Sequence, residues 1–341
     1  MKKSLIALAA VAASGAAFAQ SSVTVFGVVD TNVTYVNGED NWSGMTSGGN
    51  ATSRLGFRGV EDLGNGLKAQ FWLEGGINTD AGDGNSGGAT GTGFEFKRRS
   101  TVSLMGNFGE VRLGRSTTAA YDATSRYDVF GTVGVGQSRQ FGDVIRISNM
   151  LSYYSNNFSG FKFGVNYGFG EVAGDNSGNS YVGAGLTYDN GPLSLGLGYD
   201  RLNDRVVQAV NTDMTRWSLG GSYNFGVVKL LGAYTNVSNK IVAGGGKIKD
   251  QDYYIGLSAP VGAAGEAKLA YNRYETKFDG EKAKADQFSL GYVHNLSKRT
   301  AVYGTYAYIK NKDGMAVTLG NGGLKDGEKQ HAVQVGVRHA F

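Results

Sequence analysis

The sequence predicts an all-β chain, a transmembrane antiparallel β-barrel of about sixteen strands. The chain carries 55 Gly and 2 Pro in 341 residues. Glycine at this abundance disfavours helices, because each Gly costs about 1 kcal/mol relative to Ala in a helix interior. Apolar and polar residues alternate along many segments, as they do in strands with one apolar face. The connections between these segments alternate between short turns and long polar stretches, which is typical of outer-membrane barrels.

Residues 1–19 are predicted to form a secretory signal peptide. Lys2 and Lys3 give a positive start, residues 5–13 are apolar, and Ala17-Phe18-Ala19 has the small-x-small pattern of a cleavage site. The apolar stretch is shorter than the ~20 residues of a spanning helix, and no run of about 18 apolar residues follows. We therefore expect an exported chain in which residues 20–341 form a single barrel domain.

The composition excludes several classes of site. The chain has no Cys, so disulfides, thiolate metal sites and cysteine nucleophiles are ruled out. Cleavage of the signal peptide removes Lys2 and Lys3, so the number of Lys and Arg residues falls from 33 to 31, against 29 Asp and Glu residues. A chain so close to neutral lacks the strongly basic charge that is typical of nucleic-acid-binding proteins. We expect no nucleic-acid partner, no cofactor and no metal ion.

The strands and their connections can be placed along the chain. Residues 67–74 alternate strictly, and so do residues 333–341, which end on Phe341. Short turns are expected at 62–66, 106–109, 156–160, 189–192, 224–226, 260–265 and 295–299. Long loops are expected at 38–50, 78–93, 116–144, 171–179, 203–213, 238–250, 277–285 and 311–328. A secreted sandwich or propeller would also alternate, but it would usually divide into smaller domains, and no linker or composition break occurs here.

The chain resembles the trimeric general porins of Gram-negative outer membranes, in the branch typical of β-proteobacteria. The resemblance rests on residues 22–30 (SVTVFGVVD), 53–64 (SRLGFRGVEDLG) and 66–69 (GLKA). It continues through residues 106–109 (GNFG), 111–115 (VRLGR) and 157–161 (NFSGF). The second half of the chain matches through its strand rhythm and the terminal Phe341.

The resemblance implies three structural features. The barrel would have sixteen strands, it would form a homotrimer packed through the walls of its early strands, and its third extracellular loop would fold inward to narrow the pore. That loop would be residues 116–144, with Asp122, Asp128 and Asp143 among its polar residues. A short helical turn fits residues 119–127.

Strand alternation assigns the charged side chains to the lumen. An arginine facing lipid at mid-bilayer costs about 2–4 kcal/mol, whereas a water-filled channel accepts it. The resemblance places the basic cluster of the pore at Arg58, Arg99 and Arg146, with Arg54, Arg98 and Arg115 as further members. Lys68 and Glu74 also point inward by parity. Each arginine could instead only pair with a wall or loop carboxylate.

These features predict a general diffusion porin of the Gram-negative outer membrane that prefers anions, because a ring of Arg or Lys attracts them. Its partners would be small hydrophilic solutes, inorganic anions, outer-membrane lipid and lipopolysaccharide. The first alternative is a channel selective for a sugar or an organic anion, for which Trp72 is a candidate stacking residue. The second is an outer-membrane enzyme or adhesin. Catalysis is not expected, since His294, His331 and His339 all lie on outward faces near strand ends.

Overall fold

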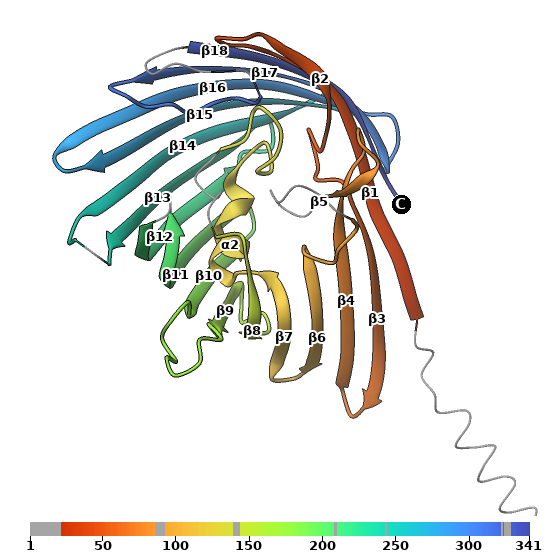
Figure 1. Ribbon diagram of the computed structural model, residues 1–341. Coiled ribbons are helices and arrows are strands. Elements are labelled where there is room, and N and C mark those ends of the chain that lie inside the picture. The colour runs from red at the N-terminus through yellow and green to blue at the C-terminus, as the bar shows by residue number, and fades with distance from the viewer. Residues whose placement is uncertain are drawn as a thin grey trace, which may run out of the picture.

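The protein is a closed antiparallel β-barrel (Figure 1). The computed structural model describes residues 22–85, 93–138, 144–207, 210–242, 244–321, 323 and 329–341. Each wall strand pairs with the next, and β18 returns to β1, with Val33 opposite Val335. Closure leaves no free sheet edge, so the backbone groups of the wall are satisfied within the bilayer. The predicted signal peptide, residues 1–19, lies outside the described residues.

Sixteen strands build the wall, which confirms the predicted fold class. They are β1 (Ser22–Asn37), β3 (Arg54–Gly64), β4 (Leu67–Asn78), β6 (Arg99–Gly106), β7 (Gly109–Thr117), β8 (Arg146–Tyr154), β9 (Phe161–Gly168), β10 (Tyr181–Asn190), β11 (Leu193–Val207), β12 (Val210–Asn224), β13 (Lys229–Ile241), β14 (Lys247–Val261), β15 (Gly265–Phe278), β16 (Glu281–Asn295), β17 (Thr300–Lys312) and β18 (Lys329–Ala340). Two shorter strands, β2 (Trp42–Ser47) and β5 (Asp83–Asn85), pair with β1 and β4 beside the wall.

Both described chain ends lie at one end of the barrel. Gly27 and Phe341 exchange two backbone hydrogen bonds of 3.1 Å. All the short turns predicted from the sequence join strands at this end. In an outer-membrane barrel the short turns are periplasmic, so we call this the periplasmic end and the opposite one the extracellular end.

Three of the loops expected at the extracellular end are mostly strand. The ladder of β11 and β12 continues until Val207 pairs with Val210. Residues 238–250 and 277–285 are likewise taken up largely by β13 to β16. The expectation of long loops was wrong here because polar side chains do not prevent backbone pairing, which continues beyond the apolar band of the wall.

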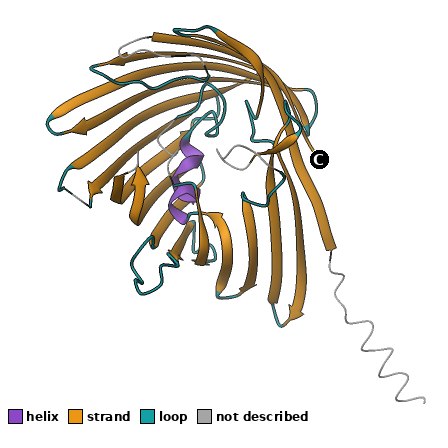
Figure 2. Ribbon diagram, viewed as in Figure 1, coloured by secondary structure: helices purple, strands orange, loops and turns teal. Residues whose placement is uncertain are grey.

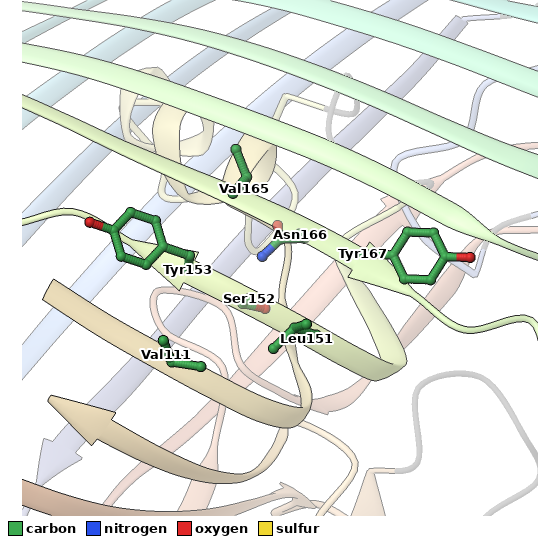
Figure 3. Close-up of a pocket in the computed structure, with 7 residues that line it drawn as sticks. All are labelled: Val111, Leu151, Ser152, Tyr153, Val165, Asn166 and Tyr167. Carbon is green, nitrogen blue, oxygen red and sulfur yellow. The ribbon is translucent and has the colours of Figure 1, made fainter. Parts of the chain in front are cut away.

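The two faces of the wall differ as alternation predicts. In β18, Val333 and Val335 are 45% and 59% exposed, whereas the intervening Gln334 is buried. Figure 3 shows apolar residues on the outer face of β7 to β9 as well, among them Leu151 and Val165. There they line an apolar groove of about 430 Å³. The outer surface is therefore an apolar band, and polar side chains face the interior.

The helical residues lie inside the arc of the wall (Figure 2). Helix α2 (Ala119–Thr124) continues into the 3-10 turn η1 (Ser125–Tyr127), where the sequence allowed a helical turn. No helix in the described ranges has the length and apolar character needed to cross a membrane. Buried apolar clusters form where the residues after this turn meet the inner faces of the strands, as with Phe130, Leu231 and Tyr254.

Candidate pore-lining site

Helix α2 rests on a bed of glycines on the inner face of β9 to β12. The hydroxyl of Thr118 caps the helix by accepting a hydrogen bond from the N–H of Tyr121. A Cβ added to Gly185 would lie 2.1 Å from the carbonyl oxygen of Ala119, and one added to Gly220 would lie 2.1 Å from the Tyr127 ring. Only glycine permits this close approach, so the wall is shaped to receive the helix.

Asp128 organises the segment that follows the helix. Its carboxylate accepts hydrogen bonds from the N–H groups of Phe130 (2.9 Å), Thr132 (3.0 Å) and Ser138 (2.8 Å), and from the hydroxyl of Tyr254 (3.1 Å). The residue is 5% exposed. Burial raises the pKa of the Asp128 carboxyl, and the hydrogen bonds oppose that shift. Asp128 therefore holds the loop in shape and does not present a charge to the lumen.

The tip of the segment reaches the opposite side of the wall. The N–H of Val135 donates to Oε1 of Gln334 in β18 at 3.4 Å. Nε2 of Gln287 in β16 donates to the carbonyl oxygen of Val135 at 3.3 Å. Residues 118–138 thus contact strands from β9 to β18 across the inner side of the barrel.

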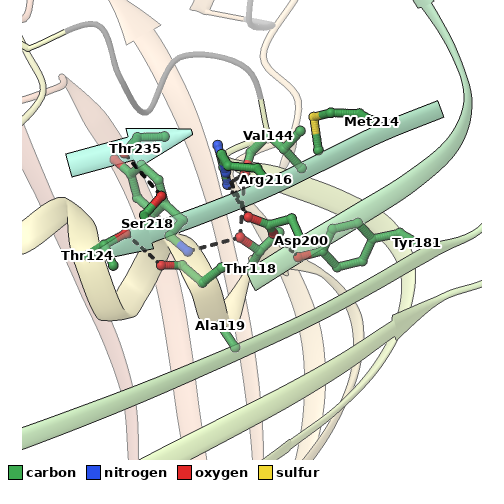
Figure 4. A network of polar contacts seen from close by, with 12 residues as sticks. Thr118, Ala119, Thr124, Val144, Tyr181, Asp200, Met214, Arg216, Ser218 and Thr235 are labelled. Atoms are coloured by element: carbon green, nitrogen blue, oxygen red, sulfur yellow. Dashed lines mark hydrogen bonds and ion pairs between the residues drawn. The ribbon is translucent and has the colours of Figure 1, made fainter. Parts of the chain in front are cut away.

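A buried ion pair on the inner wall holds Val144, which in turn contacts Thr118 (Figure 4). Arg216 in β12 contacts Asp200 in β11 at 2.6 Å and donates to the carbonyl oxygen of Val144 at 3.2 Å. The hydroxyl of Tyr181 donates to the other oxygen of Asp200. The hydroxyl of Thr118 also reaches Val144, at 3.4 Å. Sequence reasoning missed this network, although Asp200 and Arg216 could have been found as inward-facing opposite charges on successive strands.

Two clusters of arginine surround glutamates on the inner wall. In the first, Nε of Arg98 contacts Glu74 at 2.6 Å, and Arg54 lies 3.9 Å from the same carboxylate. Nε of Arg146 donates to the carbonyl oxygen of Arg98 at 3.0 Å. Nε1 of Trp72 also donates to Glu74, at 3.2 Å. Four predicted residues, drawn from β3, β4 and β8 and from just before β6, therefore meet at one place.

The second cluster is centred on Glu110 in β7. Arg112 forms two hydrogen bonds with it, at 2.9 and 3.0 Å, and Arg99 lies 3.8 Å away. The guanidinium of Arg112 also stacks 4.3 Å from the ring centroid of Tyr154. Sequence reasoning missed Arg112 and Glu110, although both share the inward parity of β7 opposite the outward Leu113.

Two guanidinium groups lie near the ring of Trp72. The Cζ atom of Arg99 is 4.4 Å from its ring centroid, and that of Arg58 is 5.4 Å away. Arg58 also lies 5.5 Å from the Phe26 ring and forms no ion pair with any described residue. Arg58 is thus a cation on the inner wall whose charge is not neutralised by a nearby described carboxylate.

The remaining predicted residues form none of the ion pairs of these clusters, although Asp122 lies beside the second one. Arg115 donates to the carbonyl oxygen of Lys97 at 2.6 Å and to the hydroxyl of Ser148 at 2.9 Å. Lys68 is exposed beside the periplasmic turn that joins β3 to β4. Asp122 is exposed and lines a recess of about 290 Å³ together with Arg112 and Lys162. Asp143 lies outside the described residues.

The histidines lie where alternation placed them. His331 and His339 are exposed on the outer face of β18, and His294 continues the outward row of β16. Each contacts a neighbouring hydroxyl group, for example that of Tyr292 for His294 at 3.2 Å and that of Thr300 for His339 at 2.9 Å. These positions are at the membrane-facing surface and away from the charged interior.

A closed barrel with an apolar exterior and a charged interior defines a channel-forming membrane protein. The model of the Gram-negative porin family matches residues 5–314, and the chain belongs to that family. It is 50% identical to outer membrane porin protein 32 of Delftia acidovorans, over the full length of both chains. It is 35% identical to an outer membrane porin protein of Bordetella pertussis, again over both full lengths.

Solved structures agree with this assignment. The anion-selective porin from Comamonas acidovorans matches with a TM-score of 0.86 and 47% identity, over 94% of this chain and 100% of that one. OmpT of Vibrio cholerae, in its trimer form, matches with a TM-score of 0.72 over 94% of this chain and 99% of that one; at 18% identity it shows the fold alone. The protein is therefore an outer-membrane channel of a Gram-negative bacterium, and its relatives are channels and not enzymes.

Proposed function

We propose that the protein is a general diffusion porin that passes small hydrophilic solutes and prefers anions. The observation that carries the proposal is the excess of arginine on the inner wall. Within the described ranges, the ion pairs of Arg54, Arg98, Arg99 and Arg112 are made with two carboxylates, those of Glu74 and Glu110, and Arg58 adds a charge without a described partner. Fixed cations that outnumber fixed anions along a pore attract anions into it. The structural relative from Comamonas acidovorans, which is called anion-selective, supports the proposal.

The proposal assigns residues 116–144 as the constriction loop. The contacts of residues 118–138 with the inner faces of β9 to β18 support a fixed segment in the lumen and not a mobile flap. Lumen-facing Asp122 would then stand opposite the arginine clusters, and the two would set up a transverse field across the narrow region. The size limit for solutes would follow from the gap between this segment and β3 to β8.

We favour general diffusion over a sugar-selective channel because the ring of Trp72, the candidate sugar-stacking residue, is already covered by guanidinium groups. Stacking on a sugar needs a free aromatic face, but the guanidinium groups of Arg58 and Arg99 lie against this ring. Non-catalytic function is part of the proposal, and the outward positions of the histidines support it. We also propose a homotrimer packed through the early strands, as the family resemblance implies, with outer-membrane lipid and lipopolysaccharide around it.

The test is the zero-current potential of the purified protein in a planar bilayer across a KCl gradient. The wild type should give ohmic channels with a chloride-favouring potential. Arg58→Ser, Arg99→Ser and Arg146→Ser should each move the potential toward potassium. Arg201→Ser is the matched control, because Arg201 shares the outward parity of Leu197 and Tyr199 in β11 and should change nothing. Wild-type channels that prefer potassium would refute the proposed anion preference. The absence of channels would refute the proposal that the protein is a porin.

A further inference from the structure

An apolar patch lies on the inner wall near the extracellular end, across the seam where the barrel closes. Val36 of β1 pairs with Ala332 of β18 in the ladder. Both residues are fully buried, and so are Ala307 and Ile309 of β17. Their side chains point inward, because alternate positions such as Tyr306 are exposed on the outer face. The lumen of a channel holds water, so an apolar patch on its inner wall needs a cover.

Two segments from distant parts of the chain cover this seam patch. Val135, at the tip of the constriction loop, is 6% exposed, and Leu319, in the connection between β17 and β18, is 4% exposed. Both belong to the same buried apolar cluster as Val36 and Ile309. Because the two side chains share one cluster, displacing either of them opens the apolar contacts of the whole cluster to water.

Two buried amide side chains fix the connection that carries Leu319 to the wall. Asn311 of β17 accepts a hydrogen bond from the N–H of Val317 at 2.9 Å and donates to the carbonyl oxygen of the same residue at 3.1 Å. Oε1 of Gln330 in β18 accepts from the N–H of Leu319 at 2.8 Å. The connection is therefore anchored by bonds of its own, and it gives the tip of the constriction loop a fixed surface to pack against.

The polar contacts of Val135 itself are long. Its N–H donates to Gln334 at 3.4 Å, and its carbonyl oxygen accepts from Gln287 at 3.3 Å. Both distances exceed the usual N–H···O range of about 2.7–3.2 Å. Burial of an apolar side chain contributes more to stability than a weak hydrogen bond does, so the apolar cluster holds the tip more firmly than these two bonds.

We infer that Leu319 is a positioning residue for the constriction: it holds the tip of the constriction loop against the seam, and its truncation releases the tip into the lumen. The inference rests on the proposed function, which makes residues 116–144 the constriction loop. Leu319 is buried and acts through Val135, not through contact with solutes. The arginine clusters are carried by β3 to β8, on other strands than the seam patch. The position of the tip and the charge preference are thus set by separate residues.

The inference is tested with a single introduced thiol, because the chain has no cysteine of its own. Val135→Cys keeps a small apolar side chain at the tip, and a buried thiol reacts with a sulfonate-bearing methanethiosulfonate reagent only when the tip opens. In this background Leu319→Ala should raise the labelling rate by roughly tenfold or more, because truncating a buried Leu costs more than the free energy of a tenfold change.

Three companion variants, each made in the Val135→Cys background, control for side effects of the truncation. Leu319→Met keeps the apolar contact and should leave the labelling rate near that of the parent. Leu319→Val is a milder truncation and should raise the rate less than Leu319→Ala, which keeps the test valid if the larger change prevents folding. Leu296→Ala removes the same atoms from a side chain that is 61% exposed in a periplasmic turn, so it should leave the rate unchanged.

Open-channel current noise gives a second readout that a purely structural role would not move. Leu319→Ala and Val135→Ala should each raise the noise, and the double variant should resemble the single variants, because each change releases the same docked tip. Equal labelling rates with Leu and Ala at position 319, or noise that adds up in the double variant, would overturn the inference. The variants should keep the chloride-favouring zero-current potential. A failure of the proposed function would instead leave the wild type without channels, while the labelling rates would still report on the tip.

Discussion

The hydroxyl of Tyr254 donates to the carboxylate of Asp128 across 3.1 Å, and the two residues are 126 positions apart in the chain. The bond joins the segment inside the barrel to β14, far from the strands between which that segment begins and ends. The same hydroxyl accepts from the N–H of Val129 at 2.8 Å. This junction ties the segment to the inner face of β14.

Replacing Asp128 with Asn should loosen this segment. The amide can keep one acceptor oxygen but turns an N–H₂ group toward donors, so the variant should lose about 1–3 kcal/mol of stability. Open-channel current noise should rise with it. Thermal unfolding followed by circular dichroism, together with single-channel recording, measures both effects. Tyr254→Phe removes both bonds of that hydroxyl, to Asp128 and from the N–H of Val129, but keeps the three backbone N–H bonds to the Asp128 carboxylate and should show a smaller effect. Equal noise in the Asp128→Asn variant and the wild type would contradict the assigned role.

Because glycines of the wall contact helix α2 and the 3-10 turn closely, a larger residue at Gly220 should displace this segment. Gly220→Ala places a Cβ within 2.1 Å of the Tyr127 ring, so the 3-10 turn must move. Overpacking of this kind costs about 1–3 kcal/mol, and a displaced segment should change the single-channel conductance. Gly232→Ala is the matched control, because the nearest atom to its Cβ is 3.8 Å away. Equal conductance and stability in the two variants would rule out a rigid bed.

The buried pair of Arg216 and Asp200 predicts a non-additive pair of mutations. Their side chains are 2% and 1% exposed. Removing one partner leaves a buried charge, so Arg216→Met and Asp200→Leu should each cost about 3–5 kcal/mol. The double variant should regain much of that loss. A double-mutant cycle from thermal or denaturant unfolding checks this, and strictly additive costs would show that the pair is not coupled.

The anion preference should not change with pH near neutrality. Arginine stays charged at any working pH, so the zero-current potential should stay constant from about pH 6 to pH 9. Bilayer recordings over that range test the point. A shift centred near pH 6.5 would indicate a histidine in the conducting path, contrary to the outward positions of His294, His331 and His339.

The wall of the barrel could be predicted almost entirely from the sequence. The outward residues such as Leu151 and Val335 and the inward Arg54, Arg58 and Glu74 follow from a two-residue period, and the turns follow from their Gly, Asn, Asp and Pro residues. Both are local properties of the chain. The extracellular ends could not be predicted as well, because polar residues such as those at 277–285 are compatible with both a loop and an extended ladder. Local composition does not distinguish these two states.

The sequence by itself determined the class of fold, the direction of each strand face and the enrichment of arginine toward the lumen. Only the tertiary structure decided which charges meet. Asp128 and Asp122 look equivalent in the sequence, yet one is buried among backbone N–H groups and the other is exposed in a recess beside Arg112. Such contacts depend on the path of a long segment and on the register around the closed barrel. Residues far apart in the chain set both, so no local pattern encodes them.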